Sequence, residues 1–163
     1  MIRLLEEKDY DTVAALVNAD WRQTYAGCVN PALLSPEGCA ERARELRADF
    51  ESGRLAEYVW EEEGRARALL SMGRTAEADL PGAFEVWRLY LAQESQGRGI
   101  GGRMLSFAEE YARGQGFLCV VIWAFSGNHR AIAFYERHGY RADREAALGG
   151  PYQAYGKRLL KRL

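Results

Sequence analysis

The stretch Gln96-Gly97-Arg98-Gly99-Ile100-Gly101-Gly102-Arg103 lies between two segments of different periodicity, and its interpretation decides the fold. An apolar run over residues 84–91, typical of a strand, precedes it, and an amphipathic helix is predicted to begin near its end, over residues 101–113. Glycines leave the backbone amides of such a loop unscreened, and a helix N-terminus carries a partial positive charge. The stretch therefore predicts a loop that binds phosphate groups.

Length and composition indicate one globular domain. The 163 residues are 48% hydrophobic and 12% aromatic, which suffices for a two- or three-layer core, so we expect residues 1–163 to form a single domain. The formal net charge is -1, with 22 basic and 23 acidic residues mixed along the chain. Without a basic field, neither a nucleic acid nor an anionic membrane is an expected partner.

Cysteine usage and the N-terminus favour a cytoplasmic location. The chain has an odd number of cysteines, Cys28, Cys39 and Cys119, and no close pair among them. This pattern favours reduced thiols over a disulfide framework or a cysteine metal site. The N-terminus has no long apolar core, and no run approaches the ~18 apolar residues of a membrane span. We therefore expect a cytoplasmic protein without a bound metal.

The remaining segments alternate between strand and helix patterns. We predict strands over residues 2–5, 55–62, 65–74, 84–91, 117–123, 140–146 and 152–160, and helices over residues 9–20, 35–50, 101–113 and 129–138. Ser35 is placed to cap the second helix and Gly53 to end it, and Glu63-Gly64 is a hairpin signal. The order of the elements predicts a mixed α/β domain and not a fully parallel, doubly wound one.

Two nucleotide-binding motifs overlap in the glycine-rich stretch, and neither has its required context. Gly97-x-Gly99-x-x-Gly102 matches a dinucleotide fingerprint, but five residues separate it from the strand, and the next strand ends without an acid for a ribose hydroxyl. A P-loop would need Lys and Ser or Thr where Arg103-Met104 stands. An ordinary flexible turn ahead of a helix stays open at this point, since glycine is common wherever backbones turn.

A third pattern, Gln96-x-x-Gly99-x-Gly101 between a strand and a helix, resembles the Gcn5-related N-acetyltransferase superfamily, whose motif is Q/R-x-x-G-x-G/A. Downstream, Asn128-x-x-Ala131-x-x-Phe134-Tyr135-Glu136-x-x-Gly139-Tyr140 looks like the family's helix after the central strands. The segments Glu85-x-x-x-Leu89-Tyr90-Leu91 and Trp21-Arg22-x-Thr24-Tyr25-x-Gly27 extend the resemblance over essentially the whole chain. One departure is Leu91-Ala92-Gln93, where many members have Val, His or Asp, then Pro.

The resemblance implies a fold and a cosubstrate. It implies a central, mostly antiparallel mixed sheet of about six to seven strands flanked by about four helices, with acetyl-CoA bound at the glycine loop and the preceding strand. The residues implied to bind acetyl-CoA are Leu89, Leu91, Gln96, Gly97, Arg98, Gly99, Ile100, Gly101, Gly102, Asn128 and Tyr135. A side chain at Gly99 or Gly101 would hinder the approach of the amides to the phosphates. The Arg98 side chain has a second interpretation, a solvated loop charge.

Transfer of an acetyl group to an amine needs two proton movements. An alkylamine with a pKa near ~10.4 is only about 0.04% neutral at pH 7, so a base must take its proton, and the departing thiolate needs a donor. By resemblance Tyr135 is the candidate donor, and a core aromatic is the alternative. Glu85 is the candidate base, directly or through water, and a solvated carboxylate is the alternative. Strand alternation places Glu85, Trp87, Leu89 and Leu91 on one face unless a bulge intervenes.

The acceptor site is the least determined part. Trp21, Tyr25, Tyr90 and Trp123 are candidates for lining it, although aromatics at such spacings also form cores. His129 and His138 lack a third nearby ligand and are interpreted as helix-surface residues. Since no cysteine lies in the motifs, we expect direct attack of a primary amine in a ternary complex. A catalytically inactive acyl-CoA-binding sensor or interaction module is the alternative function. The identity of the acceptor and the oligomeric state stay open. The resemblance allows a homodimer.

Overall fold

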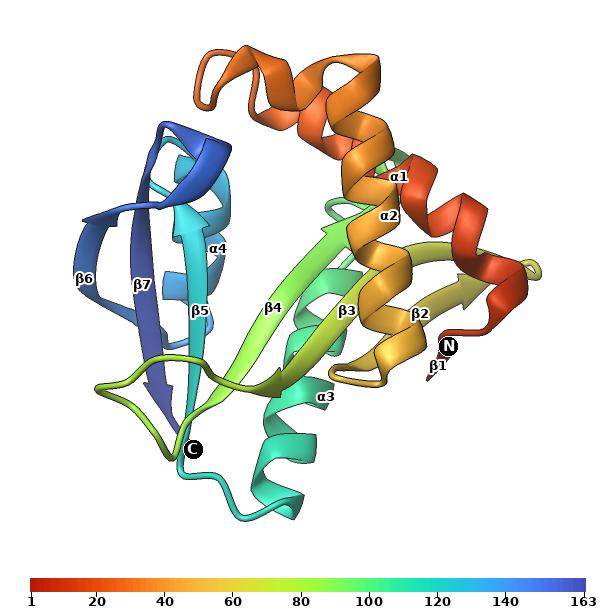
Figure 1. The fold of residues 1–163 in the computed structure, drawn as a ribbon. Coiled ribbons are helices and arrows are strands. Elements are labelled where there is room, and N and C mark those ends of the chain that lie inside the picture. The colour runs from red at the N-terminus through yellow and green to blue at the C-terminus, as the bar shows by residue number, and fades with distance from the viewer.

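The computed structural model describes residues 1–163 and contains one seven-stranded sheet in the order β1-β2-β3-β4-β5-β7-β6 (Figure 1). The strands are β1 Ile2–Leu4, β2 Ala56–Glu62, β3 Arg65–Arg74, β4 Phe84–Leu91, β5 Cys119–Phe125, β6 Arg141–Ala147 and β7 Tyr155–Arg162. The helices are α1 Tyr10–Thr24, α2 Pro36–Ser52, α3 Ile100–Gly114 and α4 His129–Arg137. Four 3-10 turns, η1 Glu7–Asp9, η2 Pro31–Leu34, η3 Gln93–Ser95 and η4 Gly150–Tyr152, connect them.

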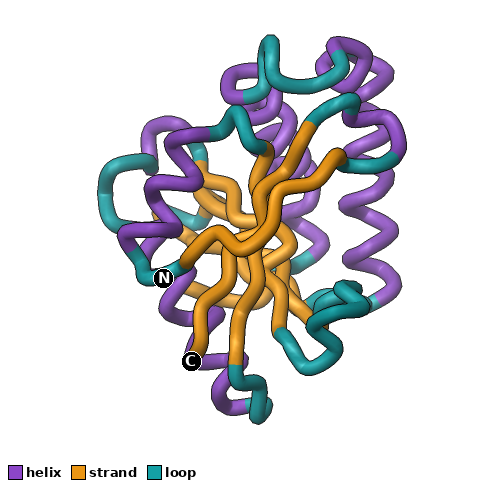
Figure 2. The backbone as a smooth tube through the Cα atoms, turned by 90° about the vertical axis from the view of Figure 1, so that its left-hand side faces the viewer, coloured by secondary structure: helices purple, strands orange, loops and turns teal.

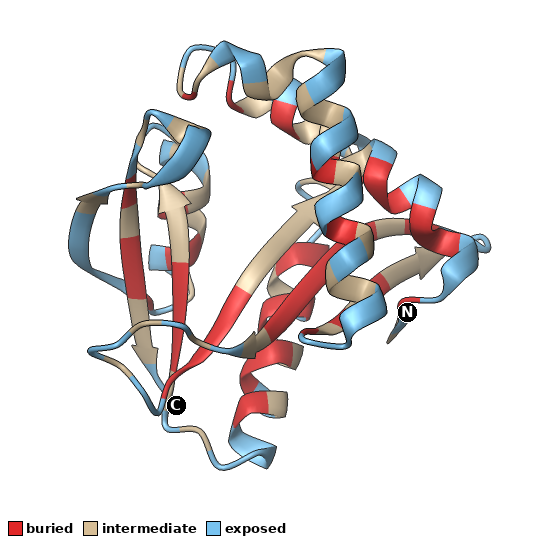
Figure 3. Cartoon of the chain, viewed as in Figure 1, coloured by how far each residue is buried: buried red, intermediate tan, exposed pale blue.

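The pairing between β4 and β5 positions the functional site. All other neighbouring strands are antiparallel, whereas β4 and β5 are parallel and pair only where Phe84–Val86 meets Val120–Ile122. Beyond these residues the two strands diverge, and the sheet opens into a V (Figure 1). Residues of both strands change from buried to half-buried where the V opens (Figure 3). The diverging arms therefore have backbone edges that no neighbouring strand occupies.

Helices cover both faces of the sheet (Figure 2). On one face, α3 contributes Met104, Leu105 and Ala108, which pack against β3, β4 and β5 and are fully buried. On the other face, α1 packs Val13 and Val17 against residues of β2 and β3. Burial of these apolar side chains removes them from water and stabilises the two layers against the sheet.

Local signals in the sequence set many of the boundaries. The predicted bounds of β3 and β4 match the structure, and the Ser35 hydroxyl accepts a hydrogen bond of 3.1 Å from the amide of Gly38 at the start of α2. Glu63 and Gly64 both have positive φ, as their hairpin requires. The largest differences are that α1 continues to Thr24, four residues beyond its predicted end, and that β7 begins three residues late because η4 intervenes.

A β-bulge changes which side chains of β4 share a face. Ser71 of β3 pairs with Arg88 and Met72 pairs with Val86, so Trp87 is the extra residue. Val86, Leu89 and Leu91 all pack on the α3 side of the sheet. Simple alternation would have placed Glu85 with Leu89 and Leu91; the bulge places Glu85 on the opposite face.

Several features bear on the broad class of the protein. None of the four helices has the length and apolarity needed to cross a bilayer. No group of three or more His, Cys, Asp or Glu side chains is arranged to hold a metal ion, and the three cysteines are free thiols.

Candidate active site

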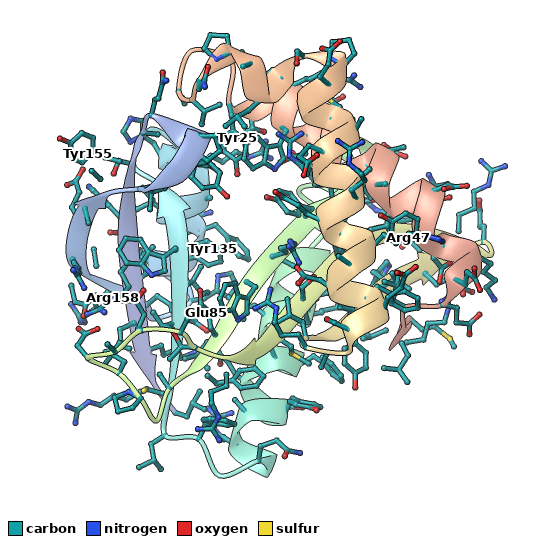
Figure 4. The ribbon with its side chains drawn as sticks, viewed as in Figure 1. Tyr25, Arg47, Glu85, Tyr135, Tyr155 and Arg158 are labelled. Carbon is teal, nitrogen blue, oxygen red and sulfur yellow. The ribbon has the colours of Figure 1, made fainter.

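A cavity of about 400 Å³ lies where β4 and β5 diverge. Residues 86–91 of β4, residues 122–124 of β5, the glycine-rich loop, α4 and the end of α1 line it. Figure 4 shows Tyr25 and Tyr135 at this opening, on elements far apart in the sequence. The predicted site residues of the loop, β4 and α4 are thus brought to one place by the splayed strands.

The glycine-rich loop presents a row of free backbone donors. None of the amide N–H groups of residues 97–102 donates to a backbone or side-chain acceptor. Gly97 and Gly99 have φ of +74° and +78°, a conformation that favours glycine, and α3 begins directly after them. Free amides at the positive end of a helix form a site for an anionic group such as a phosphate.

Gly101 and Gly102 serve a different purpose from Gly97 and Gly99. A Cβ at Gly101 would lie 3.3 Å from the Phe134 ring, and one at Gly102 would lie 2.9 Å from Nε2 of His138. Both contacts are with α4 or its end, so these two glycines let α3 approach α4 closely. The sequence-based explanation for Gly101, access of amides to a ligand, is supplemented by this packing.

Two predicted loop residues point their side chains away from the cavity. The Arg98 guanidinium forms an ion pair of 2.9 Å with Glu62 of β2, and the Ile100 side chain is buried in the α3 core. Only the backbone of these residues belongs to the row of free amides. Gln96 lines the cavity, and its amide donates to the carbonyl of Leu91 at 3.4 Å.

Asn128 and Tyr135 reach the cavity from α4. The Asn128 carboxamide oxygen caps α4 by accepting from the amide of Ala131 at 3.1 Å, and its nitrogen donates to the Tyr25 hydroxyl at 3.4 Å. Tyr135 is buried, and its hydroxyl has no hydrogen-bond partner within the protein. Burial raises the pKa of Tyr135 above its ordinary value, which keeps the phenol protonated and able to donate.

Glu85 lies at the base of the V (Figure 4), in a different environment from Tyr135. Its carboxylate accepts a hydrogen bond of 2.7 Å from the Thr75 hydroxyl, and its side chain is not part of the cavity lining. Burial raises the pKa of Glu85, while the hydrogen bond from Thr75 acts in the opposite direction. Any proton path from the cavity to Glu85 therefore runs through water and not through direct contact.

The four predicted acceptor-site aromatics are distributed over two cavities. Tyr25, Tyr90 and Trp123 line the cavity between the strands, and the Trp123 indole donates to Glu77 at 3.1 Å. Trp21 lines a second cavity of about 610 Å³, which lies beside α2. Tyr90 belongs to both cavities.

The two cavities meet at β4. Trp87, Arg88 and Tyr90 line both of them. Arg88 is held by an ion pair of 2.6 Å with Asp49 of α2. This stretch of β4, which contains the bulge, is the partition between the two spaces, so ligands in the two cavities would meet there.

Sequence reasoning did not find Asp20, Thr24, Trp87 or Arg88 as lining residues. Asp20 and Thr24 lie on the part of α1 that borders the predicted end of that helix. The only indication of them in the sequence was the stretch from Trp21 to Gly27, which includes Thr24 and lies next to Asp20. Nothing in the alternation of β4 signals the bulge that turns Trp87 and Arg88 toward the cavities.

Residues 13–140 match the sequence model described as the acetyltransferase (GNAT) family. The chain belongs to this family. This GNAT protein is also similar to the probable N-acetyltransferase Rv2775 of Mycobacterium tuberculosis, with 27% identity over 146 residues that cover 87% of this chain and 80% of the relative. The resemblance stated from the motifs is confirmed, and the chain is an N-acetyltransferase with acetyl-CoA as its cosubstrate.

Solved structures agree on the fold of this GNAT acetyltransferase. The PaiA N-acetyltransferase of Thermoplasma acidophilum, solved with coenzyme A, superposes with a TM-score of 0.75 at 20% identity, covering 100% of this chain and 98% of that one. The putative acetyltransferase yncA of Salmonella typhimurium, solved with acetyl-CoA, gives a TM-score of 0.72 at 17% identity, with coverage of 99% and 92%. The predicted mixed, mostly antiparallel sheet with four flanking helices is confirmed.

Proposed function

We propose that this GNAT acetyltransferase moves the acetyl group of acetyl-CoA directly to a primary amine, with both substrates bound at once. The observation that carries the proposal is the partition formed by Trp87, Arg88 and Tyr90, which two cavities share. Acetyl-CoA would occupy the cavity between the strands on the side of the glycine-rich loop and α4. The acceptor, entering from the cavity beside α2, would bring its amine past the partition into the part of the first cavity that the end of α1 lines. No acyl carrier on the protein is needed in such a ternary complex.

The free backbone groups support this placement of acetyl-CoA. The pyrophosphate would lie on the amides of residues 97–102, and the pantetheine arm would follow the unpaired edge of β4 beyond Val86. Leu89, Leu91 and Asn128 line the same space. This order brings the thioester toward Tyr135 on α4.

The proposed chemistry uses Tyr135, Glu85 and the backbone of β4. The amine nitrogen attacks the carbonyl carbon of the thioester, a C–N bond forms, and the C–S bond breaks as the tetrahedral intermediate collapses. Tyr135 donates its proton to the departing sulfur and is reprotonated from solvent, a role that a buried, protonated phenol suits. Glu85 takes the proton of the attacked nitrogen through water, since its carboxylate lies outside the cavity lining. A backbone N–H on the free edge of β4 would bind the oxyanion.

Thiol release in the presence of a panel of primary amines tests the proposal. The expected result is amine-dependent release of coenzyme A, with one acetyl group added to the amine by mass spectrometry. Calorimetric binding of acetyl-CoA without turnover on any amine would favour an acyl-CoA-binding sensor. Protection against thermal unfolding by NAD(P), and not by coenzyme A, would contradict the assignment of the glycine-rich loop.

A further inference from the structure

Asp20 is the only acidic residue among those that line the cavity between β4 and β5. It lies near the C-terminal end of α1. No histidine lines the cavity either. Within this lining, Asp20 is therefore the only side chain whose ordinary pKa makes it a base at neutral pH.

One oxygen of the Asp20 carboxylate has no partner in the protein. Oδ1 accepts a hydrogen bond of 3.3 Å from the Thr24 hydroxyl, whereas Oδ2 takes part in no hydrogen bond and no ion pair. Arg88, Arg130 and Arg137 line the same cavity, and none of them forms an ion pair with Asp20. The charge of Arg130 acts on Asp20, but no ion pair forms, so the half-buried carboxylate can still accept a cation from outside.

Asp20 also lies close to the phenols of the site. Burial raises the pKa values of Tyr25, Tyr90 and Tyr135, and the negative charge of Asp20 raises all three further. The pKa of Asp20 itself is raised by burial and lowered by the Thr24 hydroxyl and by the charge of Arg130. The Asp20 carboxylate and the Tyr135 hydroxyl thus belong to the same cavity. Glu85 does not line that cavity.

We propose that Asp20 binds the ammonium group of the acceptor and takes its first proton, so that the acceptor is an alkylamine that arrives as a cation. This inference rests on the proposed function. The proton moves from nitrogen to the free carboxylate oxygen and on to solvent, which releases the lone pair for attack. The second proton leaves the attacked nitrogen toward Glu85 through water, and Tyr135 supplies one proton to sulfur. The alkylammonium and acetyl-CoA thus become amide, thiol and one released proton.

The experiment compares two classes of amine in wild type and Asp20→Asn at pH 7. Alkylamines are almost wholly protonated at this pH, whereas aniline and O-methylhydroxylamine are mostly neutral and need no first deprotonation. We expect Asp20→Asn to lower kcat/KM about 100-fold for alkylamines, and to change it less than about threefold for the weakly basic amines. Glu85→Gln should lower kcat/KM for both classes of amine alike. Asp11→Asn removes an exposed carboxylate from the same helix and should change neither.

Far-UV circular dichroism and calorimetric titration with acetyl-CoA show whether each variant is folded and competent to bind. If Asp20→Asn does not fold, Asp20→Ser also removes the carboxylate and carries the same expectation. Equal losses for both amine classes, or no loss for alkylamines, overturn the role of Asp20 while the proposed transfer stands. A wild-type protein that turns over neither class overturns the proposed function and the role of Asp20 with it.

Discussion

The indole nitrogen of Trp21 donates a hydrogen bond of 2.9 Å to the hydroxyl of Tyr90, and this bond joins α1 to the strand between the two cavities. Trp21 is buried and packs edge-on against Tyr25 and Phe125, so its donor has few alternative partners. The bond fixes the Tyr90 ring at the partition. It therefore links the stability of the helical layer to the shape of the site.

Replacing Tyr90 with Phe should lower the free energy of unfolding by about 1 kcal/mol, because a buried indole N–H loses its acceptor. Urea denaturation measures the change. Tyr58→Phe is the matched control, since the Tyr58 hydroxyl on β2 forms no hydrogen bond. Equal stability of Tyr90→Phe and wild type would show that the Trp21 bond contributes nothing.

Tyr135→Phe should lower kcat about 100-fold while the Kd for acetyl-CoA stays within about twofold, because only the proton for the sulfur is lost. Pre-steady-state thiol release must first show that chemistry limits the rate in the wild type. Tyr111→Phe on α3 removes a phenol that lies outside the cavity and serves as the control. An unchanged kcat under these conditions removes Tyr135 from the donor role.

Gly99→Ala should weaken acetyl-CoA binding about tenfold and destabilise the fold by about 1 kcal/mol, since an L-residue at φ of +78° is strained. Calorimetric titration and thermal unfolding measure the two effects. Gly149→Ala provides the control, because Gly149 has φ of -69° and open space around the added methyl. If both substitutions behave alike, the conformation of the loop does not govern binding.

Arg158 is buried and binds three carboxylates, those of Glu77, Asp79 and Asp143, at 2.8 to 2.9 Å. Arg158→Gln leaves these partly exposed carboxylates without their shared partner and, since solvent screens them, should lower the free energy of unfolding by about 1 to 2 kcal/mol. Arg65→Gln, an exposed arginine without an ion pair, should change it by less than about 0.5 kcal/mol. A small effect at Arg158 would mean that Arg144 or solvent compensates the carboxylates.

The free energy of unfolding of Glu85→Gln, relative to that of wild type, should increase as the pH rises from about 4 to 7. Burial raises the pKa of Glu85 in the folded state, so the folded protein binds this proton more tightly than the unfolded chain. The stability that this tighter proton binding contributes is fully present below the pKa of Glu85 in the unfolded chain. It is lost as the pH rises through the pKa of Glu85 in the folded protein. Urea denaturation across this range measures the difference, with the exposed Glu145→Gln as control. A pH-independent difference would contradict the raised pKa.

The sequence was sufficient where local chemistry decides the structure. The turn at Glu63 and Gly64, the cap at Ser35 and the glycine-rich loop before α3 all depend on neighbouring residues, and their positions could be predicted. The candidate residues Tyr25, Tyr90, Asn128 and Tyr135 all line one cavity, and what each of them binds stays a prediction.

A bulge in β4 could be allowed for, but features that depend on pairing between distant segments could not be located from the sequence. The divergence of β4 from β5 after Val86 and the bulge at Trp87 result from the register of neighbouring strands, which local periodicity does not record. The bulge moved Glu85 to the face opposite Leu89. Asp20 was missed because its side chain faces the cavity only once α1 lies across the sheet.

A crystal structure of the protein with acetyl-CoA bound is the sharpest test of the proposed binding mode. We expect the pyrophosphate on the amides of residues 97–102, the pantetheine arm along the free edge of β4, and the sulfur within hydrogen-bond distance of the Tyr135 hydroxyl. Acetyl-CoA bound in the cavity beside α2, or with its sulfur remote from Tyr135, would contradict it.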